Sequence, residues 1–308
     1  MTDLSNLVFA DLAVDLQPSL SRYKRVGDNL ELCAIPQELW TEIEAMRADM
    51  LGHKAARFRM TWGSGPMTMR VQRRDTPAGP VFVARLIDSK LRDFESLGLP
   101  TMLIRKLRLP SLRGGMVLFA GSPGSGKTTT ASSMMVDRLI QIGGFAWTAE
   151  NPVEYNLQGS HGKGQCYQEE IDDDRDVMRV LMDTLRSSAD IFYIGEIREE
   201  SAARAACLAA NSGLLVLATI HADNINQAVG KISLLAGPQQ IASALRAVIS
   251  LRLEHKLSAA AGPDRVLKAD ALFLDDEPIR MKVRDGNVAA LNMDIERQRN
   301  LMLVGVAA

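Results

Sequence analysis

One stretch of this sequence decides its fold: Gly121-Ser122-Pro123-Gly124-Ser125-Gly126-Lys127-Thr128. It fits the pattern G-x-x-x-x-G-K-S/T, whose glycines let the backbone curl until successive N–H groups point inward at phosphate oxygens. An apolar run at residues 116–120 precedes the loop, and residues 127–142 have the pattern of a helix. Strand, loop and helix in this order predict a phosphate-binding loop at the positive end of a helix dipole.

The residue types of this loop have defined chemical tasks. We expect Lys127 to reach the β- and γ-phosphates of a nucleotide and Thr128 to hold Mg²⁺ through its hydroxyl. The other predicted nucleotide contacts are Gly121, Ser122, Pro123, Gly124, Ser125, Gly126 and Thr129. The expected cofactors are therefore ATP and Mg²⁺. The loop alone does not name the reaction, because kinases, GTPases, helicases and motors share it.

Apolar segments alternate with helical patterns after the loop. Residues 145–149, 191–195 and 214–219 predict strands, and residues 174–188 and 199–211 predict helices. This alternation predicts an α/β domain with a parallel central sheet covered by helices.

The chain before the loop predicts a smaller α+β domain. Residues 37–51 have apolar positions at helical spacing, and residues 56–62, 67–72 and 80–87 read as strands of an antiparallel sheet. Proline and glycine near residues 97–110 indicate a hinge into the second domain. We therefore expect domains at residues 1–109 and 110–308.

The C-terminal part predicts a separate helical and hairpin subregion from about residue 238. A helical stretch is expected through residue 253. Two later segments, residues 266–274 and 279–284, are predicted to form a hairpin.

Composition and charge exclude several classes. The 308 residues are 46% hydrophobic with a net charge of −1, as in a soluble globular protein. Residues 54–113 carry thirteen lysines or arginines against four acids, a net charge of +9, which suits phosphates, lipid headgroups or an acidic neighbouring subunit. Without a dense basic run containing aromatics, nucleic acid is not expected as a direct ligand.

The cysteines and the lack of apolar segments bear on location. The three cysteines form no CxxC pair, so neither a zinc site nor a disulfide framework is indicated. Neither a signal peptide nor a membrane-spanning run is visible, so a cytoplasmic location is expected.

Three further segments carry a family resemblance. Thr148-Ala149-Glu150-Asn151-Pro152-Val153-Glu154-Tyr155 resembles the Asp box of secretion ATPases. Ile191-Phe192-Tyr193-Ile194-Gly195-Glu196-Ile197-Arg198-Glu199 resembles their Walker B segment, and Leu215-Val216-Leu217-Ala218-Thr219-Ile220-His221-Ala222 resembles their His box. With the Walker A loop, the four motifs have the order and spacing of the type II/type IV secretion ATPase superfamily. The resemblance covers roughly residues 63–274 and implies a RecA-like P-loop ATPase domain preceded by a PAS-like domain.

The candidate catalytic residues follow from strand position and from this resemblance. Glu196 ends a buried strand at the carboxyl edge of the sheet, where a carboxylate orients or deprotonates the attacking water. Glu150 follows another strand and is expected to contact Mg²⁺ through water or to position the nucleophilic water. Glu154 is the weaker acid of this box and is equally compatible with a structural ion pair. His221 follows the next strand, and the resemblance implies that it senses the γ-phosphate.

Phosphoryl transfer also needs positive charge against the γ-phosphate, which an arginine can deliver in trans. Members of the superfamily take two arginines from strands of the N-terminal domain, and Arg70 and Arg85 resemble them. Arg73 and Arg74 are nearby alternatives, and the competing explanation is that all four belong to a solvated sheet face.

The resemblance implies a homo-hexameric ATPase that works with inner-membrane platform or secretion-channel proteins. Its members drive pili, type II secretion or conjugation, and peripheral membrane association arises through such partners. The lack of a tetracysteine insertion favours the compact pilus-retraction class or the type IVB conjugation and export class. Two alternatives stay open, namely an ATP-binding scaffold with little turnover and a DNA-translocating ring ATPase.

Overall fold

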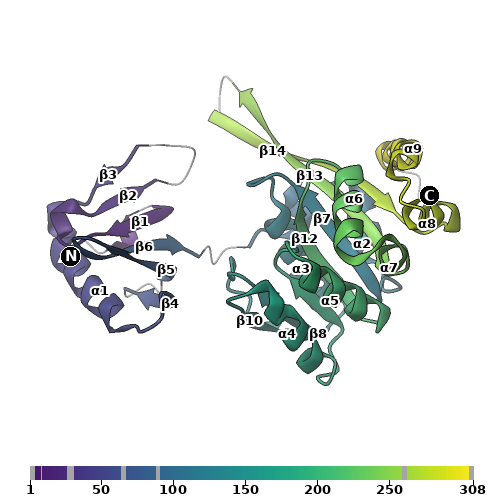
Figure 1. Ribbon diagram of the computed structural model, residues 1–308. Helices are drawn as coiled ribbons and strands as arrows, with labels where there is room; N and C mark the ends of the chain where they lie inside the picture. The colour runs from purple at the N-terminus through teal and green to yellow at the C-terminus, as the bar shows by residue number, and fades with distance from the viewer. Residues whose placement is uncertain are drawn as a thin grey trace. The chain divides into compact units, whose positions relative to one another are not determined.

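A computed structural model describes residues 4–7, 9–25, 31–63, 67–87, 91–258 and 262–304. The chain divides into two compact units, residues 1–89 and residues 90–308, and each has its own sheet (Figure 1). The two units are described in turn.

The first unit is an antiparallel sheet packed on one helix. Its strand order is β3-β2-β1-β6-β5-β4. The bounds are β1 Asp11–Val14, β2 Arg22–Lys24, β3 Cys33–Ala34, β4 Arg57–Trp62, β5 Met67–Thr76 and β6 Gly79–Leu86. Helix α1, Trp40–Gly52, buries Ile43, Met46 and Met50 in the same cluster as Met69 and Phe82 of the sheet. This unit is the predicted α+β domain. The prediction missed β1, β2 and β3, because strands of two to four residues are too short to show a period of two.

The second unit contains an eight-stranded sheet in the order β14-β13-β7-β12-β11-β8-β10-β9. The strands from β13 to β10 are parallel, and β14 and β9 run antiparallel at the two edges. The bounds are β7 Gly115–Gly121, β8 Gly144–Glu150, β9 Gly159–His161, β10 Gly164–Glu170, β11 Ile191–Ile194, β12 Leu215–His221, β13 Leu245–Ser258 and β14 Gly262–Phe273. The α/β fold class with a parallel central sheet is confirmed.

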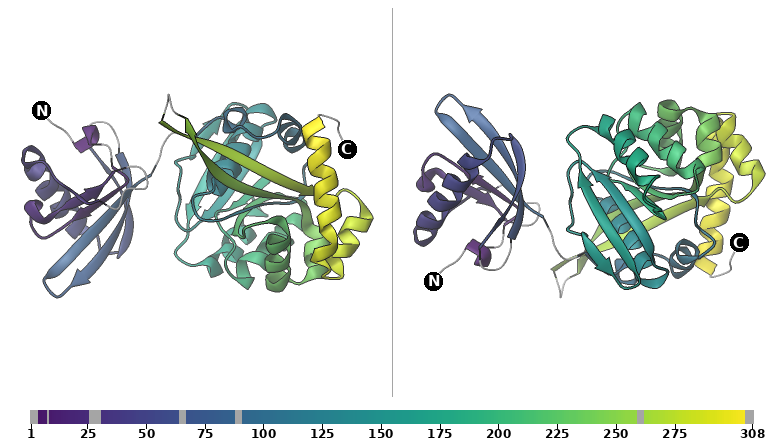
Figure 2. Two further views of the ribbon diagram at one scale, coloured as in Figure 1. Left: turned by 90° about the horizontal axis from the view of Figure 1, so that it is seen from above. Right: turned by 90° about the horizontal axis from the view of Figure 1, so that it is seen from below.

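Helices cover both faces of this sheet (Figure 1). Helices α2, Thr101–Arg108, and α3, Lys127–Gln141, pack on one face, and α4, Val177–Thr184, α5, Glu200–Asn211, α6, Ile225–Ala236, and α7, Pro238–Ala244, pack on the other. Beyond them lie α8, Glu277–Arg284, and α9, Asn292–Val304, and Figure 2 shows α9 in yellow beside the end of the β13–β14 hairpin. Among the described residues, no helix combines the length and apolar character needed to cross a bilayer.

The boundary between the units lies earlier than the expected residue 109. Residues 91–109 belong to the second unit, because Phe94, Leu97 and Leu103 are buried with Val117 and Met134 in its core. The expected hinge residues at 97–100 and 109–110 therefore lie within that unit, with Leu97 and Leu99 buried and Leu109 exposed.

The side chains of α3 also hold this segment in place. The Ser133 hydroxyl donates to the carbonyl oxygen of Arg92 at 2.7 Å. Arg138, which is 4% exposed, donates to three carbonyl oxygens at the end of α2 and just after it. They belong to Leu107, Leu109 and Leu112. The helix that follows the phosphate loop is thus hydrogen-bonded to residues 92–112, the first part of the second unit.

Two predictions for the C-terminal part are wrong. The helix expected from residue 238 to residue 253 ends at Ala244, and residues 245–258 form strand β13 instead. The hairpin partner of β14 is β13, whereas residues 279–284 lie in helix α8. The apolar run in β13 is buried between β7 and β14, and a buried strand shows no alternation that would separate it from a helix.

Candidate nucleotide site

Four neighbouring parallel strands bring the sequence motifs to one edge of the sheet. Strands β7, β12, β11 and β8 lie side by side and end at Gly121, His221, Ile194 and Glu150, with Glu196 two residues beyond β11. Because the carboxyl ends of parallel strands share an edge, residues distant in sequence become neighbours there. In the register of β12 and β7, His221 is directly beside Gly121.

Glycines shape the phosphate loop between β7 and α3. A Cβ atom on Gly121 would lie 2.2 Å from Ser125 Oγ and 2.5 Å from the carbonyl oxygen of Leu251, so this position has no room for a side chain. Gly126 precedes α3 in the left-handed region, with φ of 93°, a conformation that glycine adopts without steric cost. The first N–H groups of α3 are thereby directed at the loop, as anion binding requires.

Lys127 is the buried cation of the site. It is 7% exposed, and its Nζ donates to the Ser122 carbonyl oxygen at 2.9 Å and lies 3.3 Å from His221 Nδ1. Burial lowers the pKa of Lys127, and the nearby carboxylates of Glu196 and Glu154 act in the opposite direction. The ammonium group is therefore held poorly hydrated, where an anionic ligand gains most from it.

His221 joins Lys127 to Glu196. His221 Nε2 lies 2.6 Å from Glu196 Oε1, although this contact lacks the geometry of a hydrogen bond. Glu196 Oε2 accepts from Arg198 Nε at 2.7 Å and lies 2.6 Å from Nη2. Lysine is a donor only, so Nδ1 of the imidazole accepts from Lys127. The four side chains form one series of close polar contacts, Lys127–His221–Glu196–Arg198.

Glu150 lies in a separate, buried part of the site. Its side chain is 2% exposed, and Oε1 accepts from Gln168 Nε2 at 2.9 Å. The backbone of Gly195 passes close by, since a Cβ there would lie 3.3 Å from Glu150 Cα. Glu150 and Glu196 therefore come from adjacent strands and have different partners.

Thr129 lies near the start of α3 and is expected to contact the nucleotide. Its hydroxyl is 2.7 Å from the hydroxyl of Tyr155.

The oxygen donors at this edge suit Mg²⁺. The described residues contain no cluster of three or more His, Cys, Asp or Glu side chains arranged to hold a metal ion. A hydroxyl at Thr128 and a carboxylate at Glu150 are the types of ligand that Mg²⁺ uses when phosphates and waters supply the remaining positions. The residues thus fit a metal bound together with a nucleotide.

A family comparison agrees with this geometry. The family model of the "Type II/IV secretion system protein" matches residues 49–299. The chain belongs to this family. The resemblance of its four motifs to the type II/type IV secretion ATPase superfamily is thereby confirmed.

Curated relatives of this family are similar over part of their length. The type IV pilus ATPase PilU of Pseudomonas aeruginosa is 37% identical over 49% of this chain and 38% of its own. The uncharacterized protein YggR of Escherichia coli is 33% identical over 55% of this chain and 53% of its own. The chain thus spans between about a third and about half of the length of these relatives.

Solved structures show the same fold. The pilus retraction motor PilT with bound ADP superimposes with a TM-score of 0.72 at 22% identity, covering 92% of this chain and 84% of its own. The ATPase DotB of Legionella pneumophila gives a TM-score of 0.70 at 19% identity, covering 97% and 84%. The RecA-like core preceded by an N-terminal domain is therefore shown for this secretion-family chain.

The two predicted arginines are cross-strand neighbours in the first unit. Arg70 of β5 pairs in register with Arg85 of β6 and, on its other side, with Arg59 of β4. Val71 and Ala84 are buried against α1, so Arg70 and Arg85 point to the opposite face of the sheet. Arg85 is bonded to Asp11 at 2.6 Å, and its side chain is 59% exposed. Similarly charged neighbours on one face are unfavourable by themselves.

Sequence reasoning missed three residues that contact the site. Arg198 lies two positions after Glu196 inside the quoted Walker B segment, so its spacing could have indicated the contact. Gln168 and Tyr155 reach Glu150 and Thr129 from β10 and from the loop after β8. Tyr155 ends the quoted Asp-box segment, but nothing in that pattern indicates its contact with Thr129. No local signal identifies Gln168, because β10 is a polar strand that the pattern did not predict.

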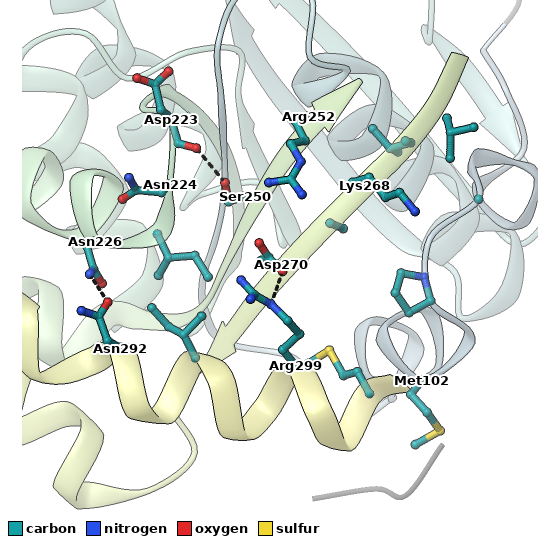
Figure 3. Close-up of a pocket in the computed structure, with 18 of the residues that line it drawn as sticks. Met102, Asp223, Asn224, Asn226, Ser250, Arg252, Lys268, Asp270, Asn292 and Arg299 are labelled. Atoms are coloured by element: carbon teal, nitrogen blue, oxygen red, sulfur yellow. Dashed lines mark hydrogen bonds and ion pairs between the residues drawn. The ribbon is translucent and has the colours of Figure 1, made fainter. Parts of the chain in front are cut away.

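A second hollow of about 790 Å³ lies between the β13–β14 hairpin, the start of α6 and α9 (Figure 3). Asp223, Arg252 and Lys268 line it, and Asp270 bonds Arg299 across it at 2.7 Å. None of the predicted nucleotide-site residues is among the described residues that line it.

Proposed function

We propose that this chain hydrolyses ATP with Mg²⁺ as a subunit of a homo-hexameric motor of a membrane-embedded machine. The observation that carries the proposal is the series Lys127–His221–Glu196, which joins the ends of β7, β12 and β11 through contacts of 3.3 and 2.6 Å. This series supports the proposal because it brings the expected phosphate-binding cation and the expected water-aligning acid into contact with one imidazole.

The residues divide the chemistry among them. Lys127 and the loop amides bind the phosphates, and the Thr128 hydroxyl with Glu150, through water, would hold Mg²⁺, which neutralises phosphate charge when bound. Glu196 accepts the proton of the attacking water or orients that water. His221 contacts both Lys127 and Glu196, so loss of the γ-phosphate beside Lys127 would change the contact between the imidazole and the Glu196 carboxylate. This coupling is the sensing role expected for the imidazole.

The family membership supports a transport motor. Relatives include proteins named type IV pilus ATPase, type IV pilus retraction ATPase and type II secretion system protein E. We infer that this chain works in the cytoplasm at the inner membrane, held there by platform or secretion-channel proteins. A type IV pilus or a type IV secretion or conjugation machine is the proposed setting.

Phosphate release by the purified protein tests this proposal. We expect steady release from ATP that requires Mg²⁺ and rises in the fraction that light scattering shows to be hexameric. If the assembled ring binds ATP but releases no phosphate, the alternative of an ATP-binding scaffold with little turnover would be favoured. Stimulation by DNA, without stimulation by lipid or by a membrane protein's cytoplasmic domain, would favour a DNA-translocating ring.

Replacing Arg70 or Arg85 with alanine is expected to lower turnover by about 100-fold or more while leaving ATP affinity within about three-fold, because a trans-acting arginine stabilises transition-state charge. Mixing either variant with inactive Lys127→Ala subunits should restore part of the activity. In such rings, an intact phosphate site meets an intact arginine from the neighbouring copy.

The matched control is Arg57→Ala, which removes an exposed arginine at the start of β4 in the same sheet. It should turn over ATP at the wild-type rate. Mixed rings that hydrolyse ATP no faster than the parent variants would argue against delivery in trans. Wild-type turnover in Arg70→Ala and in Arg85→Ala would indicate that both arginines only belong to a solvated sheet face.

A further inference from the structure

The Gln168 side chain connects the Glu150 carboxylate to the loop that follows β8. Its Nε2 donates to Glu150 Oε1 at 2.9 Å and to the Tyr155 carbonyl oxygen at 3.0 Å. Its Oε1 accepts the Leu157 N–H at 2.5 Å. We propose that Gln168 is a positioning residue, which holds the Glu150 carboxylate in the place that hydrolysis requires.

The hydrogen bonds fix the orientation of the Gln168 amide. A glutamine amide has two N–H donors on one side and an acceptor oxygen on the other. In Gln168 both donors face oxygen atoms and the acceptor faces an N–H group. The flipped amide would set its oxygen against a carboxylate and a carbonyl, so only one orientation satisfies all three partners.

Strand pairing explains why Gln168 reaches Glu150. Strand β10 is parallel to β8, and Gln168 is in register with Thr148, two residues before Glu150. Glu150 is 2% exposed. A buried carboxylate needs hydrogen-bond donors to offset the free energy of removing its charge from water. A neutral amide supplies such a donor without neutralising the carboxylate, which leaves its charge available to water or to a metal ion.

The same amide also connects Glu150, through Tyr155, to the first turn of α3. Tyr155, whose carbonyl accepts from Gln168, places its hydroxyl 2.7 Å from Thr129 Oγ1 in the first turn of α3. Gln168 is therefore bonded both to the acid and to the loop that touches the helix beginning at Lys127. Catalytic groups misplaced by about 1 Å lose on the order of 100-fold in rate, so this connection bears directly on turnover.

A purely structural role would have a different signature. Leu157 is 4% exposed and belongs to the core of the second unit, so Gln168 also anchors its backbone N–H. Gln168→Glu retains an acceptor for that N–H and loses the donors toward Glu150 and the Tyr155 carbonyl. Gln168→Met loses all three contacts. Comparing the two variants separates anchoring of the Leu157 backbone from the contacts that the Gln168 Nε2 group makes.

The experiment measures kcat, KM and the calorimetric Kd for ATP on the full chain. We expect Gln168→Glu and Gln168→Met to lower kcat by about ten-fold or more, with the Kd for ATP within about three-fold. Gln165→Glu is the matched control, because Gln165 lies on the same strand and its Oε1 accepts from Ser160. It should retain the wild-type kcat. A wild-type kcat in Gln168→Glu would overturn the inference.

A thermal double-mutant cycle provides a second readout. Gln168→Glu sets two carboxylates at hydrogen-bond distance and should lower the melting temperature by about 3 °C or more. Glu150→Gln with Gln168→Glu exchanges the two groups and should recover most of that loss. Turnover should stay low, since the carboxylate is then on the wrong strand. If the decreases in melting temperature of the two single variants simply add in the double variant, the Gln168–Glu150 contact does not form.

This inference rests on the proposed ATP hydrolysis, and the measurements keep the two apart. If the wild-type ring releases no phosphate, the proposed function fails, and the thermal cycle still decides whether the contact exists. If the wild type hydrolyses ATP and Gln168→Glu does so equally well, the inference alone fails.

Discussion

Lys127→Ala is expected to weaken ATP binding by about 100-fold or more. The Lys127 ammonium is buried at the start of α3 and bonded to the loop carbonyl of Ser122 and to His221. Hydrogen bonds to charged groups contribute about 1.5–3 kcal/mol each, and every 1.4 kcal/mol is a ten-fold change in affinity. Because Lys127 is expected to contact two phosphates, its removal should lose both contacts. Isothermal titration calorimetry with Mg-ATP measures the effect.

The control for this variant is Lys163→Ala. Lys163 is an exposed lysine of the same unit, and its Nζ donates only weakly, at 3.3 Å, to the carbonyl oxygen of Gln141. It should bind ATP as the wild type does, with a comparable circular dichroism spectrum in both variants. Near-wild-type affinity in a folded Lys127→Ala protein would contradict the assignment of the phosphate site.

Glu196→Gln is expected to bind ATP and to hydrolyse it about 100-fold more slowly or worse. The substitution preserves the size of the side chain but removes the carboxylate that accepts a proton, and general-base catalysis is typically worth about 10²–10⁴-fold. The amide also changes the contacts of this side chain, since Glu196 accepts from Arg198 and lies 2.6 Å from His221 Nε2. The amide NH2 group must face either Arg198 or the imidazole, which disturbs this series of contacts as well. Steady-state phosphate release, measured beside calorimetry, separates turnover from binding.

Glu200→Gln serves as the comparison. Glu200 lies four positions further on, in α5, and pairs with Arg204 at the surface at 2.5 Å. Its loss should leave the rate unchanged, because exposed ion pairs of this kind contribute little. An undiminished rate in Glu196→Gln would remove the acid from the mechanism.

The elements around the phosphate loop could be predicted from the sequence because each strand is a short apolar run and each helix has a clear period. The strand predicted at residues 116–120 and the helix from Lys127 are present with nearly the same bounds. Strand β10, with sequence GQCYQEE, was missed because most of its residues are polar and it lies near the sheet edge. The first residues of strand β13 fit a helix prediction because this buried run has no clean alternation.

The candidate site could be predicted only as far as strand ends determine it. Glu150, Glu196 and His221 each follow a parallel strand, so their placement at one edge follows from topology. Hydrogen-bond partners do not follow, since Gln168 reaches Glu150 across 18 residues and His221 reaches Lys127 across 94. Such contacts depend on side-chain geometry that periodicity does not contain. The roles of all these residues remain predictions.

The Arg138 guanidinium couples helix α3 mechanically to the backbone that precedes β7. Because Arg138 grips three carbonyl oxygens after α2, and Ser133 holds the backbone at Arg92, the helix that starts at Lys127 cannot tilt without dragging residues 92–112 along. The division between the two units lies immediately before this segment, at residues 89 and 90. If phosphate binding at Lys127 displaces α3, we therefore expect residues 92–112 to move with it as one rigid piece.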